Sequence, residues 1–202
     1  LGATNLSMYK YKEDGTYTGT SWDITNGTSG LVSPTACTYD SLGAYFYIVC
    51  DTTDKVAQFD STGVYTSATN DVAVGAEEPS PTGLTFYNNQ LYIIGSTNYT
   101  IYEYNLSTGY TSDSWLMTAV DNTPNGLSFY GSDFWLTGGT LGKVFKLNSS
   151  FAYKSPISTQ AQNPRGIEYD DTANKYYVVD IINNGVYRYS DTLVYDGFSF
   201  DT

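Results

Sequence analysis

The hydrophobic residues of this chain fall in short runs with a period of two, and no stretch repeats an apolar residue every three to four positions. Such alternation is typical of β-strands with one buried face, so the sequence predicts strands and turns and essentially no helix. Four runs are apolar at almost every position, as expected for strands covered on both faces. These runs are residues 46–49, 91–94, 134–137 and 176–179.

The four apolar runs belong to an internal repeat. A proline followed two positions later by glycine or alanine recurs every 40 to 47 residues, at Pro34, Pro81, Pro124 and Pro164. Each proline opens an alternating strand, which leads through a turn to the apolar run, then to a third strand and a weaker fourth. Four strands per unit of this length predict an all-β fold, a β-propeller of four-stranded antiparallel blades.

The repeat also sets the expected blade boundaries within a single propeller domain over residues 1–202. Four complete blades are predicted at about 30–76, 77–120, 121–160 and 161–202. Residues 2–11 align with residues 95–104, and residues 21–25 match the fourth strand of the other units. Residues 1–29 are therefore predicted to supply only the third and fourth strands of a blade, that is, a half blade.

A half blade leaves the ring incomplete, because the two strands it lacks are the most buried ones and unpaired inner edges promote aggregation. Three interpretations follow. The chain is part of a longer protein, as an incomplete five-bladed or larger ring; it receives strands from a neighbouring subunit in an open head-to-tail arrangement; or it is a four-bladed ring with an extra outer hairpin. The first two predict that the isolated chain is not a self-contained monomer.

The last repeat resembles a known family. Its segments Asn163-Pro-Arg-Gly-Ile-Glu-Tyr-Asp170, Tyr177-Val-Val-Asp180 and Asn183-Asn-Gly-Val-Tyr-Arg-Tyr189 are similar to the NHL repeat. The other units match it more loosely, with Ala36 in place of the glycine and Gly95 or Gly138 in place of the aspartate. The resemblance implies a propeller fold, whereas NHL-like propellers serve as binding modules, lyases and hydrolase-like enzymes.

Composition narrows the chemistry. The 202 residues include 9 Lys+Arg, 21 Asp+Glu and no histidine, for a net charge of −12. Nucleic acid is an unsuitable partner, because neutralising phosphates needs a basic surface. The absence of histidine excludes Ser-His-Asp, Cys-His and HExxH sites. No run approaches the roughly 18 apolar residues of a membrane span, so none is predicted.

Candidate metal ligands are few. Enzymes that resemble this family place metal ligands or a His/Glu pair at one end of the channel, where the second strands end. The acidic residues at the matching positions are Asp51 and Asp180, and the first strand of the last blade adds Glu168. Because Ca²⁺ takes six or more oxygen ligands, these three form at best a weak site. The alternative is that they accept backbone N–H groups at strand ends, so we expect no cofactor, with Ca²⁺ as the only candidate.

The two cysteines and five sequons are candidate modification sites. Aligned on the second blade, Cys37 faces Ile48 and Cys50 lies two residues along on the same side, which allows a disulfide; two buried thiols are the alternative. Asn-x-Ser/Thr occurs at Asn5, Asn26, Asn98, Asn105 and Asn148. In a secreted protein these exposed loop positions are glycan sites, although turns favour asparagine in any case.

Large apolar side chains at the half blade and on the fourth strands are candidate assembly contacts. They are Leu1, Met8, Trp22, Trp115, Phe198 and Phe200. Exposed tyrosines beside Asn, Asp and Thr would also suit sugar stacking or protein contacts.

These features together predict a non-enzymatic, extracellular or cell-surface β-propeller that acts as a structural or interaction module. Its expected partner is a copy of itself, assembled head-to-tail into a filament or surface layer by strand completion, or another extracellular protein. The first alternative is a lectin that binds glycans, and the second is a Ca²⁺-dependent lyase- or lactonase-like enzyme.

Overall fold

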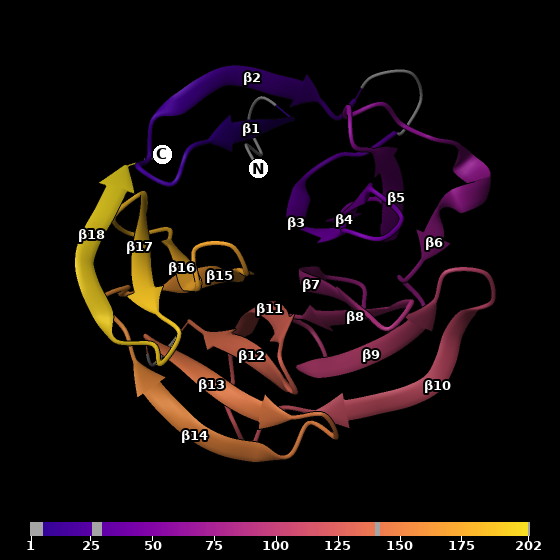
Figure 1. The fold of residues 1–202 in the computed structure, drawn as a ribbon. Helices are drawn as coiled ribbons and strands as arrows, with labels where there is room; N and C mark the ends of the chain where they lie inside the picture. The colour runs from indigo at the N-terminus through magenta and orange to yellow at the C-terminus, as the bar shows by residue number, and fades with distance from the viewer. Residues whose placement is uncertain (1–5, 26–29, 140–141, 202) are drawn as a thin grey trace. The chain divides into compact units, whose positions relative to one another are not determined.

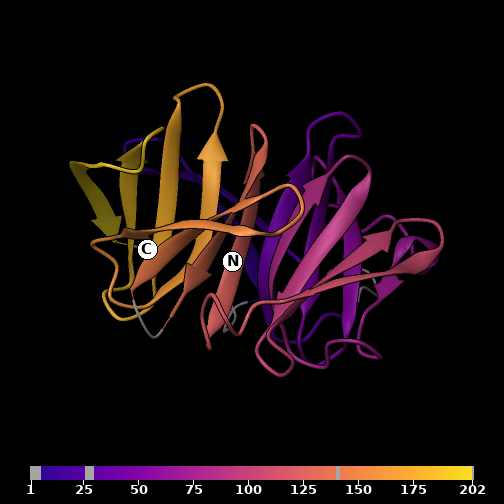
Figure 2. The ribbon, with the colours of Figure 1, turned by 90° about the horizontal axis from the view of Figure 1, so that it is seen from below.

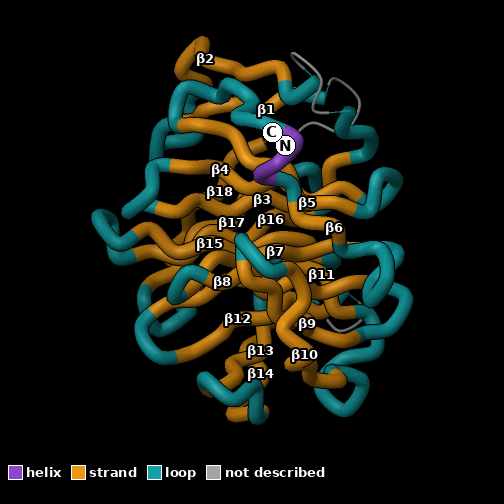
Figure 3. Tube along the Cα trace, turned by 90° about the vertical axis from the view of Figure 1, so that its right-hand side faces the viewer, coloured by secondary structure: helices purple, strands orange, loops and turns teal. Residues whose placement is uncertain are grey.

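The computed structural model describes residues 6–25, 30–139 and 142–201, whose regular structure is almost entirely β (Figure 3). One 3₁₀ turn, η2 (Ala68–Asn70), is the exception among these residues. The strands are β1 (Ser7–Tyr11), β2 (Tyr17–Asp23), β3 (Pro34–Asp40), β4 (Tyr45–Cys50), β5 (Lys55–Asp60), β6 (Val72–Ala73), β7 (Pro81–Tyr87), β8 (Gln90–Gly95), β9 (Thr100–Asn105), β10 (Gly109–Leu116), β11 (Pro124–Tyr130), β12 (Asp133–Gly138), β13 (Lys143–Asn148), β14 (Tyr153–Ser158), β15 (Pro164–Asp170), β16 (Lys175–Asp180), β17 (Gly185–Ser190) and β18 (Tyr195–Asp201). Within the described residues, no helix is long and apolar enough to cross a membrane.

The strands form four four-stranded sheets and one two-stranded sheet, in sequence order (Figure 1). We call β3–β6, β7–β10, β11–β14 and β15–β18 blades 1 to 4, and β1–β2 the half blade. The predicted all-β architecture of four blades and a half blade is therefore confirmed. The chain divides into two compact units, residues 1–114 and 115–202. Figure 2 shows the strands of blade 4, in orange to yellow, side by side.

The repeat's proline starts the first strand of every blade. It pairs with the last residue of the second strand, in the pairs Pro34–Cys50, Pro81–Gly95, Pro124–Gly138 and Pro164–Asp180. A register irregularity follows each proline, which has no N–H to donate to the ladder. The proline therefore fixes where each blade begins.

Apolar side chains from neighbouring blades pack together within each unit. In the first unit, Tyr47 and Val49 of blade 1 share a buried cluster with Leu84 and Ile93 of blade 2. In the second unit, Trp135 of blade 3 belongs to a buried cluster that contains Tyr176 and Val178 of blade 4.

Blade 1 has an unusually short fourth strand, β6, with two residues. Polar side chains occupy the preceding segment, where Asn70 Nδ2 donates to Gln58 Oε1 (3.0 Å) and to Thr66 Oγ1 (3.1 Å). Thr66 Oγ1 in turn donates to the carbonyl of Gln58 (3.1 Å). This network links the segment to β5. The turn η2 is capped by Ser67, whose hydroxyl accepts the N–H of Thr69 (3.1 Å); the sequence pattern did not predict this turn.

Candidate functional site

The end of the second strand in blade 4 carries a buried carboxylate, Asp180, which is 0% exposed. Its Oδ1 accepts the N–H groups of Asn163 (3.1 Å) and Ile182 (3.0 Å). Its Oδ2 accepts from Gln162 N–H (3.0 Å) and Asn183 Nδ2 (2.7 Å). Burial raises the pKa of this carboxyl, but the four donors outweigh burial and hold the pKa below its usual value. Asp180 thus ties together the two loops at this end of blade 4.

Blade 2 places a carboxylate at the same point from a different position in the sequence. Glu78, three residues before β7, is 0% exposed. Its Oε1 accepts the N–H groups of Ser80 (3.1 Å) and Thr97 (3.3 Å), and its Oε2 accepts that of Asn98 (3.1 Å). The second strand here ends in Gly95, and a Cβ on that residue would overlap the Glu78 side chain. Glycine therefore replaces the aspartate because a glutamate from the preceding loop fills its place.

Blade 3 shows the same replacement of the second-strand aspartate by a carboxylate from the preceding loop, whereas blade 1 has no carboxylate at this point. In blade 3, Asp121 is 3% exposed, and a Cβ on Gly138 would overlap its carboxylate. In blade 1 both positions are apolar and buried, with Leu31 and Cys50. Burial raises the pKa of the Cys50 thiol to about 11, so this thiol is not a reactive nucleophile at neutral pH. Neither Glu78 nor Asp121 was identified from the sequence. The signal for each was an acidic residue shortly before the first strand of a blade whose second strand ends in glycine.

The three candidate metal ligands have different surroundings. Asp51 is partly exposed, and its Oδ1 accepts from Thr52 Oγ1 (3.0 Å). Asp180 is committed to the four donors above, and Glu168 lies in the middle of β15. Across the described residues, no group of three or more acidic or cysteine side chains is placed to hold a metal ion.

Glu168 is a carboxyl of the second unit whose pKa is raised. Its side chain is exposed, yet the protein packed around the inner strand disfavours the charged form and raises its pKa to about 7. The Tyr169 N–H and the Ser128 hydroxyl act in the opposite direction, and Asp171 adds to the rise. A carboxyl of this kind changes protonation near neutral pH.

Polar side chains on the first strands bind the backbone of the next blade. In the first unit, Thr35 Oγ1 donates to the carbonyl of Pro81 (2.7 Å), and Thr38 Oγ1 accepts the N–H of Phe86 (3.2 Å). In the second unit, Asn125 Nδ2 donates to the carbonyl of Pro164 at 3.5 Å. Counted from the proline that opens each repeat, residues at the second position (Thr35, Asn125) and at the fifth position (Thr38) therefore bind the main chain of a neighbouring strand.

The half blade is firmly attached to blade 1. Met8 is 5% exposed and lies in the buried cluster with Ile48 and Phe59, so it packs inside the unit. Trp22 lies 6.0 Å from the Phe46 ring, and a Cβ on Gly63 would overlap the Trp22 ring. Of the six predicted assembly contacts, Met8 and Trp22 thus join the half blade to blade 1.

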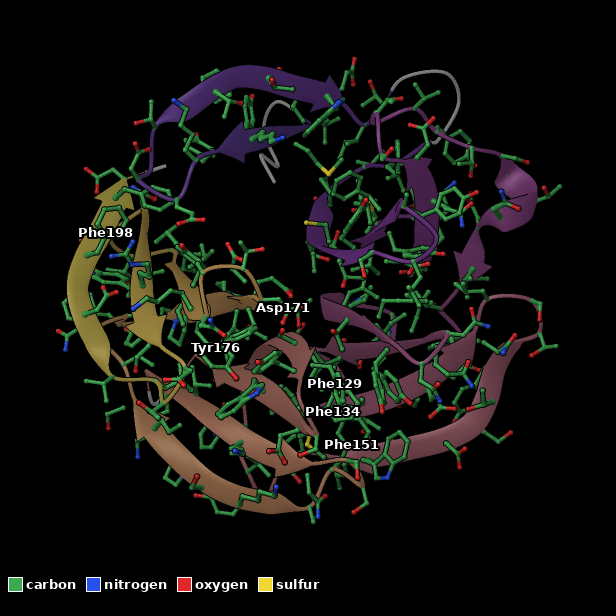
Figure 4. All side chains as sticks on the ribbon, viewed as in Figure 1. Phe129, Phe134, Phe151, Asp171, Tyr176 and Phe198 are labelled. Atoms are coloured by element: carbon green, nitrogen blue, oxygen red, sulfur yellow. The ribbon has the colours of Figure 1, made fainter. Side chains whose placement is uncertain are left out.

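Trp115 occupies the equivalent place in the second unit. Its ring centroid lies 4.3 Å from that of Phe151, which in turn lies 4.1 Å from Phe134. Phe129 completes this aromatic cluster 4.8 Å from Phe134, and Figure 4 shows the three phenylalanines together. An aromatic residue near the end of a fourth strand therefore packs on the next blade in both units.

The fourth strand of blade 4 carries the remaining assembly candidates. Phe198 and Phe200 have ring centroids 6.0 Å apart, and the Arg188 guanidinium lies 4.2 Å from the Phe198 centroid. Asp196 accepts from Arg188 Nε (2.8 Å) and forms an ion pair with Lys175 (3.2 Å). Leu1, the sixth candidate, lies outside the described residues.

The cysteine prediction is only partly resolved by the structure. Cys37 pairs with Ile48 across the β3–β4 ladder, as expected. Both cysteines are thiols here, with Cys37 exposed and Cys50 buried. A disulfide between them stays a prediction.

Three of the five sequons fall within the described residues, whereas Asn5 and Asn26 lie outside them. Asn105 Oδ1 accepts the N–H of Ser107 (2.9 Å), and Asn148 Oδ1 accepts that of Ser150 (3.0 Å), so both stabilise turns between the third and fourth strands. Asn98 Nδ2 donates to the carbonyl of Glu77 (2.6 Å). Glycosylation of these residues stays a prediction.

Comparison with known proteins identifies the fold. No family model matches the chain, and no curated protein matches its sequence. The NHL resemblance therefore stays an expectation. Many solved structures match, at low sequence identity.

One match is a nidogen/laminin complex, with a TM-score of 0.64 and 14% identity over 98% of this chain and 76% of that one. A second is virginiamycin B lyase from Staphylococcus aureus (TM-score 0.54, 18% identity, 86% of this chain and 55% of that one). A third is glutaminyl cyclase from Myxococcus xanthus (TM-score 0.60, 10% identity, 79% and 66%). The chain spans about half the length of several solved proteins that it matches. These similarities show a β-propeller fold, which the chain shares with a lyase, a cyclase and a protein of a nidogen/laminin complex.

Proposed function

We propose that this chain is a non-enzymatic, extracellular β-propeller module that assembles with copies of itself, with strands of a neighbouring copy completing the half blade. The two-stranded sheet carries this proposal. β1 and β2 form a sheet of two strands, whereas every blade has four. Isolated two-stranded hairpins are marginal in water, and sheets with accessible edges readily take up further strands.

The attachment of the half blade supports this role. The Met8 and Trp22 contacts hold the hairpin on blade 1, so it is a fixed part of the unit. A rigid hairpin loses little conformational entropy when a strand is added, which favours assembly. The matching nidogen/laminin structure shows that a propeller of this kind occurs in a protein–protein complex.

An enzyme is the second candidate, because a lyase and a cyclase share the fold. Glu168, with a pKa of about 7, is the observation that favours it, since general acids and bases work best near the ambient pH. Against it, the chain has no histidine, and the carboxylates of Glu78 and Asp180 are occupied by backbone N–H groups. We therefore favour assembly over catalysis.

A proline substitution in the half blade tests the proposal. Tyr9→Pro removes an N–H group on the edge of β1 that faces away from β2, because the backbone of the next residue, Lys10, faces β2 and its carbonyl accepts from Thr18 Oγ1 (2.8 Å). The substitution should shift the particle mass, measured by light scattering, towards that of one chain. Glu13→Pro is the matched control. Glu13 follows Lys12 in a turn closed by the Gly15 N–H to the Lys12 carbonyl (3.0 Å), where proline is well tolerated. A wild-type protein that stays a single chain at all concentrations would contradict the proposal.

A further inference from the structure

One face of the blade 1 sheet is covered by blade 2. Tyr47 and Val49 on β4 are 1% and 0% exposed because blade 2 packs on them, and the Tyr47 and Phe86 rings stack 5.4 Å apart. The main chain of β7 is held at the same time by Thr35 and Thr38. The covering element is thus the first hairpin of the next blade, β7–β8, bound through apolar packing and two backbone contacts.

Blade 3 repeats the arrangement in the second unit. Trp135 and Thr137 on β12 are 5% and 0% exposed, and the Trp135 ring lies 5.1 Å from Tyr176 of blade 4. Asn125, at the same repeat position as Thr35, donates to the first strand of blade 4. In both units, therefore, one face of a blade is a binding surface for a β-hairpin of the same repeat.

The corresponding face of blade 4 is partly open. Val179 takes the place of Val49 in the repeat and is 39% exposed. Glu168 is exposed, whereas Thr38 at the same repeat position is buried. Arg165 is exposed, as is Thr35 at the same repeat position, and its Nη1 donates to Asn125 Oδ1 of blade 3 (2.8 Å). Ile181, directly after β16, is 46% exposed. We define Arg165, Glu168, Val179 and Ile181 as the blade 4 face.

We propose that the blade 4 face binds a β-hairpin with the pattern of this repeat, which places an aromatic residue on its first strand. Arg165, which also holds Asn125, would donate a further guanidinium N–H to a carbonyl of that strand, and Glu168 would accept the N–H of the residue five positions along, as Thr35 and Thr38 do for Pro81 and Phe86 of β7. Val179 would pack on the apolar second strand. This inference rests on the proposed function, because a first-and-second-strand hairpin is also the element that would extend the half blade to four strands.

A hairpin peptide with the sequence of residues 81–95 is a suitable probe. These residues form β7–β8 around Asn88 and Asn89, whose φ values of 51° and 62° give a tight two-residue turn. A fluorescently labelled peptide, with lysines added for solubility, is titrated into the full chain and followed by anisotropy. A scrambled peptide of the same composition is the negative control. We expect saturable binding of the hairpin and none of the scrambled peptide.

Two matched variants locate the binding. Val179→Asp puts a charge into the blade 4 face and should weaken hairpin binding at least tenfold. Val194→Asp makes the same change at a turn position that is 64% exposed, and should leave binding unchanged. A photo-crosslinker at the Phe86 position of the peptide should label β15 or β16, and this mapping does not depend on the folding of a variant.

The outcomes separate this inference from the proposed function. The inference is overturned if the hairpin does not bind. It is also overturned if the crosslinks map to β1 and Tyr9→Pro, but not Val179→Asp, abolishes binding; in that case half-blade completion survives. If the hairpin labels blade 4 while the native protein stays a single chain, self-assembly fails and the binding face stands.

Discussion

The exchange between Glu78 and Gly95 provides a sharp test of how the blade ends are held. In Glu78→Ala, the N–H groups of Ser80, Thr97 and Asn98 lose their acceptor. A buried donor without a partner costs about 1–3 kcal/mol. Because Asn98 is exposed and water can replace part of the loss, we expect the free energy of unfolding to fall by about 3 kcal/mol.

Gly95→Asp alone should also destabilise the chain, since its Cβ would overlap Glu78, and overpacking costs about 1–3 kcal/mol. The double variant reproduces blade 4, where Ala161 precedes the first strand and Asp180 ends the second. Its new carboxylate can accept the same N–H groups. The double variant should therefore be more stable than either single variant, with a coupling free energy of at least about 2 kcal/mol.

Urea unfolding followed by circular dichroism measures all four proteins of this cycle. The control cycle combines Glu78→Ala with Gly109→Asp. Gly109 has a φ of 79°, so this substitution is also strained, but its Cβ meets no atom within 4 Å and therefore does not touch Glu78. The control should be additive within about 0.5 kcal/mol. If the effects of the Glu78 and Gly95 substitutions on the free energy of unfolding are additive to the same extent, the side chains at these two positions do not compete for the same space.

Three further predictions concern single residues. Trp22→Ala should lower the free energy of unfolding by about 2 kcal/mol in urea, because it removes the ring that packs the half blade on Phe46; an unchanged midpoint would show that this contact contributes nothing. Ser112→Gly should raise the thermal midpoint by a stabilisation of about 0.5–1 kcal/mol, since Ser112 has a φ of 80°, and a lower midpoint would contradict this. Glu168→Gln should flatten the pH dependence of stability: the raised pKa means that the folded chain binds more protons than the unfolded one between pH 4.5 and about 7, so wild-type stability falls as pH rises through that window. Parallel wild-type and variant curves from pH 4.5 to 7.5 would exclude this role.

The all-β pattern of four-stranded blades was accessible from sequence because it depends on local chemistry. Pro34 and its three counterparts cannot donate to a ladder, so each marks the start of a strand. The apolar run that ends in Val49 is buried on both faces, as its composition indicates. Period and turn residues carry this information directly.

The residues that hold the blade ends were harder to identify, because they depend on which side chain reaches a shared point in space. Asp180 reaches it from the second strand and Glu78 from the preceding loop. A repeat alignment compares equivalent positions only. Gly95 therefore looks like the loss of a carboxylate, although Glu78 supplies that carboxylate from another position. Met8 shows a related limit: its apolar character was clear, but whether it faced solvent or blade 1 depended on tertiary packing.

In the proposed assembly, strands from a neighbouring copy complete the half blade. Electron cryomicroscopy of the native protein tests it most directly, because added strands would be visible beside the β1–β2 sheet. We expect particles of more than one chain, with at least one strand of a neighbour paired to β1. Particles of a single chain, with no neighbouring strand at β1, would contradict it.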